Sequence, residues 1–248
     1  MSTSPLSVQL YTVREALNAD PRAAYERLSE LGFTSVEPFG LVERFDQYSE
    51  FLPEFGFSAP SAHAALLGKD QAAIFEAARS LGVTTVIDPH IDREKWSTLD
   101  DVTASATALN AAGALAADYG LTVGYHNHWW ELEHSIDGVP SLEVFASLLD
   151  PSLVIELDTY WSSVGGVDPV AFLDRLGQRA QFLHIKDGDI SQDDKKQVAV
   201  GSGRMPVLDI LAAAPHATRV IELDDFEGDV FDALADSISY LTANGESL

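Results

Sequence analysis

Histidines, carboxylates and one lysine recur in this chain at a spacing of two residues. The pairs are His126 with His128, Glu156 with Asp158, His184 with Lys186, and Glu222 with Asp224. In a β-strand, residues two apart point to the same face. Because several carboxylates and imidazoles on one face would repel one another and lose their hydration, a bound cation is the economical explanation for the set. The pattern predicts a divalent-metal site with positions left open for the oxygen atoms of a substrate.

The chain contains no cysteine, which narrows the choice of ligands. Any metal ion must be held by histidine and carboxylate side chains, and neither a disulfide nor a cysteine nucleophile can form. Such a mixed ligand set suits Mn²⁺, Mg²⁺, Co²⁺ or Zn²⁺ and does not choose among them.

Short β-prone runs alternate with longer helical segments along the whole chain. We expect strands over 8–10, 35–37, 58–62, 84–88, 121–126, 153–158, 182–185 and 219–222, and a last helix over 230–241. This alternation implies parallel strands with right-handed crossovers, and eight strands favour closure. The prediction is a single α/β domain over residues 1–248, a (β/α)₈ TIM barrel. The alternative is an open Rossmann-like sheet, but no G-x-G-x-x-G follows the first strand.

Four predicted helices end on a glycine that is followed by an apolar residue. A left-handed glycine cap explains this pattern, since the chain must stop, turn and enter the next strand. The four glycines are Gly32, Gly56, Gly82 and Gly120.

Ionisable residues stand at the ends of most predicted strands. Because the C-terminal ends of barrel strands converge on one mouth, these residues are the candidates for function. They include Glu37, His63, Asp88, His126, Asp158, His184 and Glu222. Glu156, two residues before Asp158, is interpreted as a buried ion-pair partner or as an anchor for a ligand histidine.

The charge of the chain excludes several classes of partner. There are 39 acidic and 15 basic residues, which give a net charge of −24 at pH 7. This charge would repel nucleic acid and disfavours an anionic membrane surface. The first residues lack the basic and apolar regions of a signal peptide, and no apolar run approaches the roughly 20 residues of a membrane span. We therefore expect a cytoplasmic protein that acts on a small molecule.

Five segments of the chain resemble the sugar phosphate isomerase/epimerase family, the xylose isomerase-like barrels, in the family's order. They are VQLYTVR at 8–14, YHNHWWE at 125–131, ELDTYW at 156–161, HIKD at 184–187 and VIE at 220–222. The resemblance implies a TIM barrel, a carbohydrate substrate and one divalent metal ion, with manganese favoured over magnesium, cobalt or zinc. A homo-oligomer or a hetero-complex is compatible with it. The apurinic endonucleases are more distant relatives, but the net charge argues against a DNA-binding groove.

The resemblance also implies a set of metal ligands. The family places one ligand at the end of each of the last four strands, usually Glu, Asp, His and Glu. Asp158, His184 and Glu222 match the last three of these by type. The fifth-strand position differs, because this chain reads His-Asn-His at 126–128 where many relatives read Glu-Asn-His. His126 is therefore the candidate for the first ligand, with Glu131 as the alternative.

This difference leaves two reactions open. The family's epimerases use two carboxylates on opposite faces of a keto-sugar, one to remove the proton next to the carbonyl and one to return it. Glu222 matches one of the two, and Glu131 is the candidate for the other. His128 and Glu222 would instead suit β-elimination by one base and one general acid. The inosose dehydratases and the enzymes that cleave 3-keto-glycosides resemble the His-Asn-His form at least as well as the epimerases do.

Four further residues are assigned to substrate binding, and each has a structural alternative. His63 ends a strand and could instead be a hydrogen-bonded core residue, while Lys186 could form an internal salt bridge. The face of Trp161 suits the C–H face of a sugar but also suits packing at the rim. Arg204 follows a glycine-rich loop, which could present N–H groups to an anion or could serve only as a hinge.

Overall fold

The computed structural model describes residues 4–248 of the chain. Eight strands make up its central sheet. They are β1 (Ser7–Gln9), β2 (Ser35–Glu37), β3 (Ser61–His63), β4 (Thr85–Asp88), β5 (Thr122–His126), β8 (Val154–Asp158), β9 (Ala180–Ile185) and β12 (Thr218–Ile221). Two small hairpins lie outside this sheet and are formed by β6 (Ser135–Ile136) with β7 (Val139–Pro140) and by β10 (Asp187–Gly188) with β11 (Gln197–Val198).

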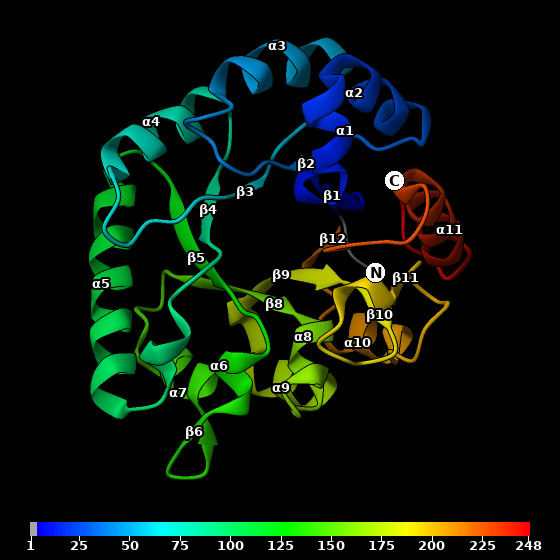
Figure 1. The fold of residues 1–248 in the computed structure, drawn as a ribbon. Helices are drawn as coiled ribbons and strands as arrows, with labels where there is room; N and C mark the ends of the chain where they lie inside the picture. Colours follow the sequence, from blue (N-terminus) through cyan, green and yellow to red (C-terminus); the bar gives the residue numbers. More distant parts are fainter. Residues whose placement is uncertain (1–3) are drawn as a thin grey trace.

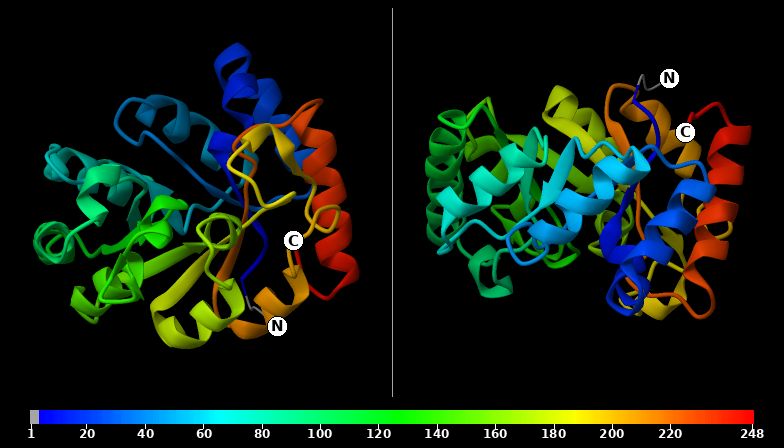
Figure 2. Two further views of the ribbon diagram at one scale, coloured as in Figure 1. Left: turned by 60° about the horizontal axis from the view of Figure 1, so that its bottom comes forward. Right: turned by 90° about the horizontal axis from the view of Figure 1, so that it is seen from above.

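The helices lie around the outside of the central strands (Figures 1 and 2). The α-helices are α1 (Arg14–Ala19), α2 (Pro21–Glu30), α3 (Phe45–Phe55), α4 (Gln71–Ser80), α5 (Leu99–Ala117), α6 (Trp130–Glu133), α7 (Ser141–Leu148), α8 (Thr159–Val164), α9 (Pro169–Leu176), α10 (Val207–Ala213) and α11 (Val230–Ala243). Short 3₁₀ turns are η1 (Leu10–Val13), η2 (Arg93–Trp96), η3 (Gly177–Arg179) and η4 (Asp194–Lys196). Among the described residues, no helix has both the length and the apolar character needed to cross a membrane.

The central sheet is a nearly closed ring. Its hydrogen-bonded order is β2-β1-β12-β9-β8-β5-β4-β3, and all neighbouring strands run parallel. The two ends of this order meet through parallel bridges between Ser35 and Ser58 and between Phe39 and His63. The predicted (β/α)₈ barrel is therefore confirmed, and the open Rossmann-like sheet is excluded.

The predicted strands are all present, with ends displaced by at most two residues in seven of the eight cases. The third strand begins at Ser61 and not at Ser58, because Pro60 has no N–H to continue the ladder of hydrogen bonds. The four glycine caps are confirmed by positive φ angles of 92°, 73°, 77° and 73° at Gly32, Gly56, Gly82 and Gly120. The two hairpins and several of the short helices were not predicted from the sequence.

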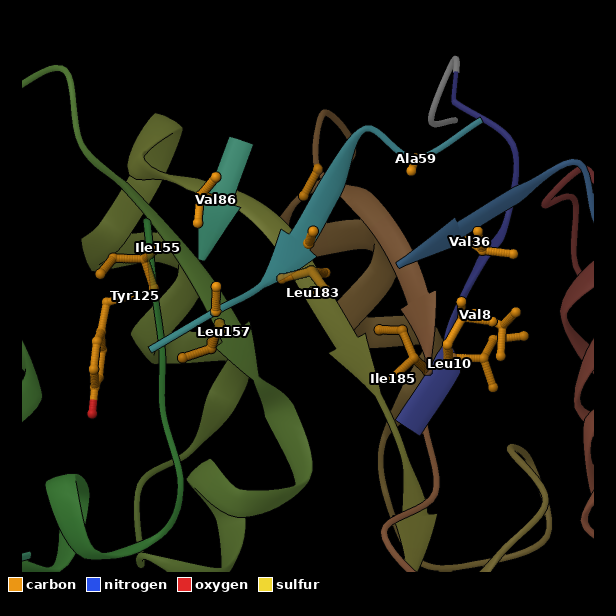
Figure 3. Close-up of a cluster of buried hydrophobic side chains, with 14 of the residues drawn as sticks. Val8, Leu10, Val36, Ala59, Val86, Tyr125, Ile155, Leu157, Leu183 and Ile185 are labelled. Atoms are coloured by element: carbon orange, nitrogen blue, oxygen red, sulfur yellow. The ribbon is translucent and has the colours of Figure 1, made fainter. Parts of the chain in front are cut away.

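The two faces of the barrel sheet carry different side chains. Apolar residues that alternate with the polar ones, including Val8, Val36, Leu157 and Leu183, belong to a buried cluster that also contains side chains from the surrounding helices (Figure 3). The polar residues on the other face contact one another across strands that are not neighbours. Glu37 on β2, for example, contacts His184 on β9. Such contacts require that these side chains point into the barrel, so the polar residues form its interior.

Gly124 on β5 lies on this inner face, and we expect that Gly124→Ala lowers the free energy of unfolding by about 1–3 kcal/mol through overpacking. A Cβ at this position would stand 2.6 Å from Ile87 Cδ1 and 2.9 Å from Val154 Cγ2. Urea denaturation measures the effect. Adding Ile87→Val removes the closest atom and should recover part of the loss, whereas a variant as stable as the wild type would contradict the close packing.

Candidate active site

The C-terminal part of the barrel interior holds a buried cluster of three imidazoles and two carboxylates. Glu156 Oε2 lies at its centre, 2.5 Å from His63 Nε2, 3.1 Å from His184 Nε2 and 3.2 Å from His126 Nδ1. Glu37 Oε1 lies 2.8 Å from His184 Nε2 and 3.2 Å from His63 Nε2. These five side chains come from β2, β3, β5, β8 and β9. The ring of strands therefore brings together residues that lie far apart in the sequence.

Two of the imidazoles connect this inner cluster to an outer pair of carboxylates at the strand ends. His184 turns Nδ1 toward Glu222 Oε2, at 2.6 Å, and Nε2 toward Glu37 and Glu156. His126 has Nε2 at 3.9 Å from Asp158 Oδ2 and Nδ1 toward Glu156. Each imidazole thus has one nitrogen for the outer carboxylates and one for the inner carboxylates.

Two overlapping sets of these residues could hold a metal ion. The outer set is His126, Asp158, His184 and Glu222, and the inner set is His63, His126, Glu156 and His184; within each set the ligand atoms lie within 4.8 Å of one another. Asp158 Oδ2 and His126 Nδ1 are buried without an aligned hydrogen bond, although Asp158 Oδ2 lies 2.9 Å from Lys186 Nζ and His126 Nδ1 lies 3.2 Å from Glu156 Oε2. The outer set is the one that the sequence predicts.

Each set has two members that line the adjacent cavity: His126 and Glu222 in the outer set, and His63 and His126 in the inner set. Only the outer set has a carboxylate in the lining, Glu222, whereas Glu156 of the inner set does not line the cavity. A histidine that binds a metal usually donates its other N–H to a carboxylate, which orients the ring. Glu156 stands in that position for His126 and His184. A divalent ion in the outer set would therefore have its two imidazole ligands oriented by the inner carboxylates.

The charge states differ between the two imidazoles of the outer set. Burial and the neighbouring His184 hold the pKa of His126 well below its usual range, so its ring is neutral and has a lone pair to offer. Burial alone would raise the pKa of Glu222, but Lys186 and His184 hold it well below its usual range. Burial disfavours the charged form of His184, yet Glu156 and Glu222 raise its pKa well above its usual value, so its ring carries a proton that a metal ion would have to displace. The carboxylates around His184 therefore favour positive charge at this position, which either this proton or a divalent ion supplies.

Lys186 does not line the cavity but lies beneath it, among the outer carboxylates. Its Nζ is 2.9 Å from Asp158 Oδ2, 2.7 Å from Glu222 Oε2 and 2.6 Å from Asp224 Oδ2. This fully buried ammonium forms the internal ion pairs that the sequence offered as the alternative to substrate binding.

A cavity of about 850 Å³ opens beside the cluster. Of the residues assigned to substrate binding, His63 and Trp161 line it. His126, His128 and Glu222 line it as well. Two of the four predicted ligands and two of the four predicted substrate contacts therefore meet in one cavity.

Glu131 is buried away from this cavity. Its Oε1 accepts a hydrogen bond from the Tyr125 hydroxyl at 2.8 Å, and its Oε2 accepts one from the His128 backbone N–H at 3.0 Å. Tyr125 alternates with His126 on β5 and belongs to the outer apolar cluster. Glu131 thus lies on the helix side of the barrel wall, and the structure does not bring it to the metal ligands.

Arg204 is also outside the cavity, and the glycine-rich loop before it has no free anion site. The Asp187 carboxylate accepts hydrogen bonds from the backbone N–H groups of Gly188, Gly201, Gly203 and Met205 at 2.8–3.0 Å. The N–H groups that could have met a ligand are therefore occupied. Arg204 itself is exposed, with its guanidinium 3.5 Å from the Asp189 carbonyl oxygen.

We expect Asp187→Ala to loosen this loop, because four backbone donors lose their acceptor and buried unpaired donors cost about 1–3 kcal/mol each. Limited proteolysis should show faster cleavage within residues 188–205 than in the wild type. Asp193→Ala, in the same loop region but exposed, is the matched control. Equal cleavage rates in Asp187→Ala and the wild type would contradict the capping role.

The sequence indicates little about the two carboxylates of the inner cluster. It places Glu37 only at the end of a strand, although Gln9 Nε2 donates to its Oε1 at 2.8 Å and Ser61 Oγ donates to its Oε2. The interpretation of Glu156 as an anchor for a ligand histidine agrees with its contacts. The alternation of polar residues on the first three strands was the available signal for Glu37.

We expect Glu156→Gln to weaken Mn²⁺ binding by about 10–100-fold, because the neutral amide oxygen is a weaker acceptor for the two imidazole N–H groups than the carboxylate oxygen. Isothermal titration calorimetry measures the affinity. The control is Glu133→Gln, an exposed carboxylate that pairs with Arg93. Unchanged affinity in Glu156→Gln would exclude the orienting role.

The comparisons with known proteins agree with this barrel. Residues 25–217 match the model of the Xylose isomerase-like TIM barrel family. An inosose dehydratase from Clostridium botulinum (strain Alaska E43 / Type E3) is 27% identical over 161 residues, which cover 62% of this chain and 47% of that enzyme. The chain thus spans about half the length of this curated relative.

Two solved structures share the fold over nearly the whole chain. A sugar phosphate isomerase/epimerase from Parabacteroides distasonis is 24% identical, with a TM-score of 0.84 and coverage of 99% of this chain and 96% of that one. The IOLI protein, solved with a binding zinc atom, is 14% identical, with a TM-score of 0.75 and coverage of 97% of both chains. The family match over most of the sequence, on a closed ring of eight parallel strands, shows that this chain belongs to the xylose isomerase-like TIM barrel family.

Proposed function

We propose that this protein is a divalent-metal-dependent lyase that removes a leaving group from a keto-sugar by β-elimination. The observation that carries the proposal is the position of Glu131, which is hydrogen-bonded on the far side of the barrel wall. Epimerisation with two carboxylates would need a second one facing the substrate from the β5 side. This chain offers His126 and His128 there instead. The match to inosose dehydratases supports the same choice.

The proposed metal ligands are His126, Asp158, His184 and Glu222. When bound, a divalent ion supplies Lewis-acid stabilisation for the negative charge that develops on a carbonyl oxygen. Two imidazoles and two carboxylates form a donor set compatible with manganese, which is the ion we propose.

Glu222 is the proposed base. It lines the cavity, and its low pKa keeps it ionised at neutral pH, so it can accept a proton from the carbon next to the carbonyl. The electron pair of that C–H bond forms a C=C bond between this α-carbon and the β-carbon. The bond between the β-carbon and the oxygen of the leaving group then breaks.

His128 is the proposed general acid for the departing oxygen. It is half-buried, lines the cavity, and stacks on Trp130 with ring centroids 4.2 Å apart and an angle of 8° between the planes. It follows β5, which is three strands from β12 in the ring, so it approaches the substrate from a different side than Glu222. Glu131 positions this residue by accepting a hydrogen bond from its backbone N–H, and Glu131 Oε1 also lies 3.7 Å from His128 Nδ1.

Proton NMR in D₂O tests the proposal. The protein is loaded with Mn²⁺ and incubated with a methyl 3-keto-glucoside and, separately, with an inosose, and the metal is removed with a chelator before the spectra are recorded. We expect release of methanol from the first or loss of water from the second, and no reaction in protein treated with chelator beforehand. Deuterium at the carbon next to the carbonyl with an inverted configuration, and no released product, would instead identify an epimerase.

A further inference from the structure

The cavity beside the cluster has two chemically different ends. One end, the histidine end, is formed by His63, His126, His128, Trp161 and Glu222 at the ends of β3, β5, β8 and β12. The other, the apolar end, is formed by segments that follow β1, β2 and β3 and by the start of α4. Its wall contains Tyr11, Phe39, Leu41, Val42, Ala73 and Ile74. A ligand that fills the cavity must therefore be polar at one end and apolar at the other.

The apolar end keeps large apolar side chains accessible beside a buried charged site. Val42 is 45% exposed and Tyr11 is 41% exposed, and Tyr11 packs edge-on against Phe39 with ring centroids 5.3 Å apart. Apolar surface that stays open next to a polar site commonly marks a binding region. The two aromatic rings are already held in place by each other, so a ligand would not need to order them.

The apolar wall does not suit a second sugar ring. A buried hydroxyl without a hydrogen-bond partner costs about 1–3 kcal/mol, and a sugar ring carries several. Four charged residues line the cavity near this end. Arg14 lies over the Tyr11 ring and donates to the Tyr11 carbonyl, and Asp70 accepts from the Ala73 N–H. Glu43 and Lys69 are exposed to solvent. An aryl or alkyl group would meet the wall without this cost.

The apolar end also continues outward. A second cavity of about 410 Å³ shares Val42, Glu43 and Ala73 with the first one. It extends between α3 and α4 along Phe45 and Ala77, with Asp46 and Glu76 also in its lining. A substituent larger than one ring therefore has room to continue past Val42 toward the surface.

We infer that the substrate is a glycoside-like keto-sugar whose substituent is apolar and at least the size of an aryl ring. Its sugar ring lies at the histidine end, and its substituent lies against Phe39, Val42 and Ile74 at the apolar end. This inference rests on the proposed function, because that function places the sugar beside Glu222.

The test compares matched glucosides that differ only in the substituent. Saturation-transfer NMR and calorimetry are carried out on metal-free protein with phenyl and methyl glucopyranosides of both anomers, and with the disaccharide cellobiose. The variants are Val42→Ser and, as the matched control, Leu208→Ser on α10, which is 44% exposed and does not line the cavity.

We expect the phenyl glucoside of at least one anomer to bind about tenfold or more tightly than its methyl counterpart, as the area of a phenyl ring predicts. Val42→Ser should weaken the phenyl compound by about three- to tenfold and leave the methyl compound unchanged, while Leu208→Ser changes neither. Any one of four results would overturn the inference. The phenyl and methyl glucosides could bind equally well, cellobiose could bind more tightly than the phenyl glucoside, Val42→Ser could weaken the phenyl and methyl glucosides equally, or no glucoside could bind at millimolar concentrations.

The test of the apolar subsite can fail or succeed independently of the test of the proposed function. The phenyl preference is measured without metal and without turnover, so an inactive or metal-free enzyme leaves it in place. Conversely, elimination from a methyl 3-keto-glucoside combined with no phenyl preference would retain the function and exclude the apolar subsite.

Discussion

His184→Ala is expected to lower the affinity for Mn²⁺ by about 100–1000-fold and to reduce turnover to background. Structural zinc sites with four ligands bind their ion with roughly 10–16 kcal/mol, which is about 2.5–4 kcal/mol for each ligand. His184 also lies between Glu222 and the inner carboxylates Glu37 and Glu156, which would lose their shared cationic partner. Calorimetric titration with Mn²⁺ measures the affinity.

Because His184 is fully buried, a second variant separates loss of the ligand from loss of the fold. Asp158→Asn keeps the shape of the side chain. It also keeps an oxygen that can accept the hydrogen bond that the Trp161 backbone N–H donates to Asp158 Oδ1 at 2.8 Å. It should show weaker metal binding with an unchanged circular dichroism spectrum. The matched control is His134→Ala, which lies outside the cavity lining and should bind Mn²⁺ like the wild type. Wild-type affinity in both ligand variants would contradict the assignment.

Glu222→Gln is expected to reduce turnover by about 100- to 10,000-fold at saturating Mn²⁺, because glutamine cannot accept the proton. The same variant should lose exchange of the substrate's acidic C–H with D₂O, which reports on proton removal alone. Asp224→Asn is the matched control, since Asp224 also lines the cavity and also contacts Lys186. If Asp224→Asn abolished exchange while Glu222→Gln retained it, Asp224 would be the base.

The barrel could be predicted because its signals are local. Gly32, Gly56, Gly82 and Gly120 mark helix ends within their own turns, and each strand is a short run of β-prone residues. The period-two spacing of the ionisable pairs likewise follows from strand geometry. Once a barrel is assumed, residues at strand ends must meet, so the convergence of His126, Asp158, His184 and Glu222 followed from the fold.

The rest of the site depends on contacts that no local pattern contains. Glu37 meets His184 from 147 positions away in the sequence. The short helix α6 begins at Trp130 and turns Glu131 back toward the His128 N–H, and a four-residue helix leaves too weak a pattern to predict that direction. Asp187 likewise reaches the loop before Arg204 over 14 to 18 residues. Side-chain orientation in these turns decides which carboxylate faces the substrate.

The central claim is that one divalent ion is held by the outer set of ligands, where a substrate can reach it. Anomalous diffraction from a crystal of the protein with Mn²⁺ tests this claim most directly. We predict a single manganese peak within bonding distance of His126, Asp158, His184 and Glu222. A peak between His63, His126, Glu156 and His184, or no peak in the barrel, would contradict the claim.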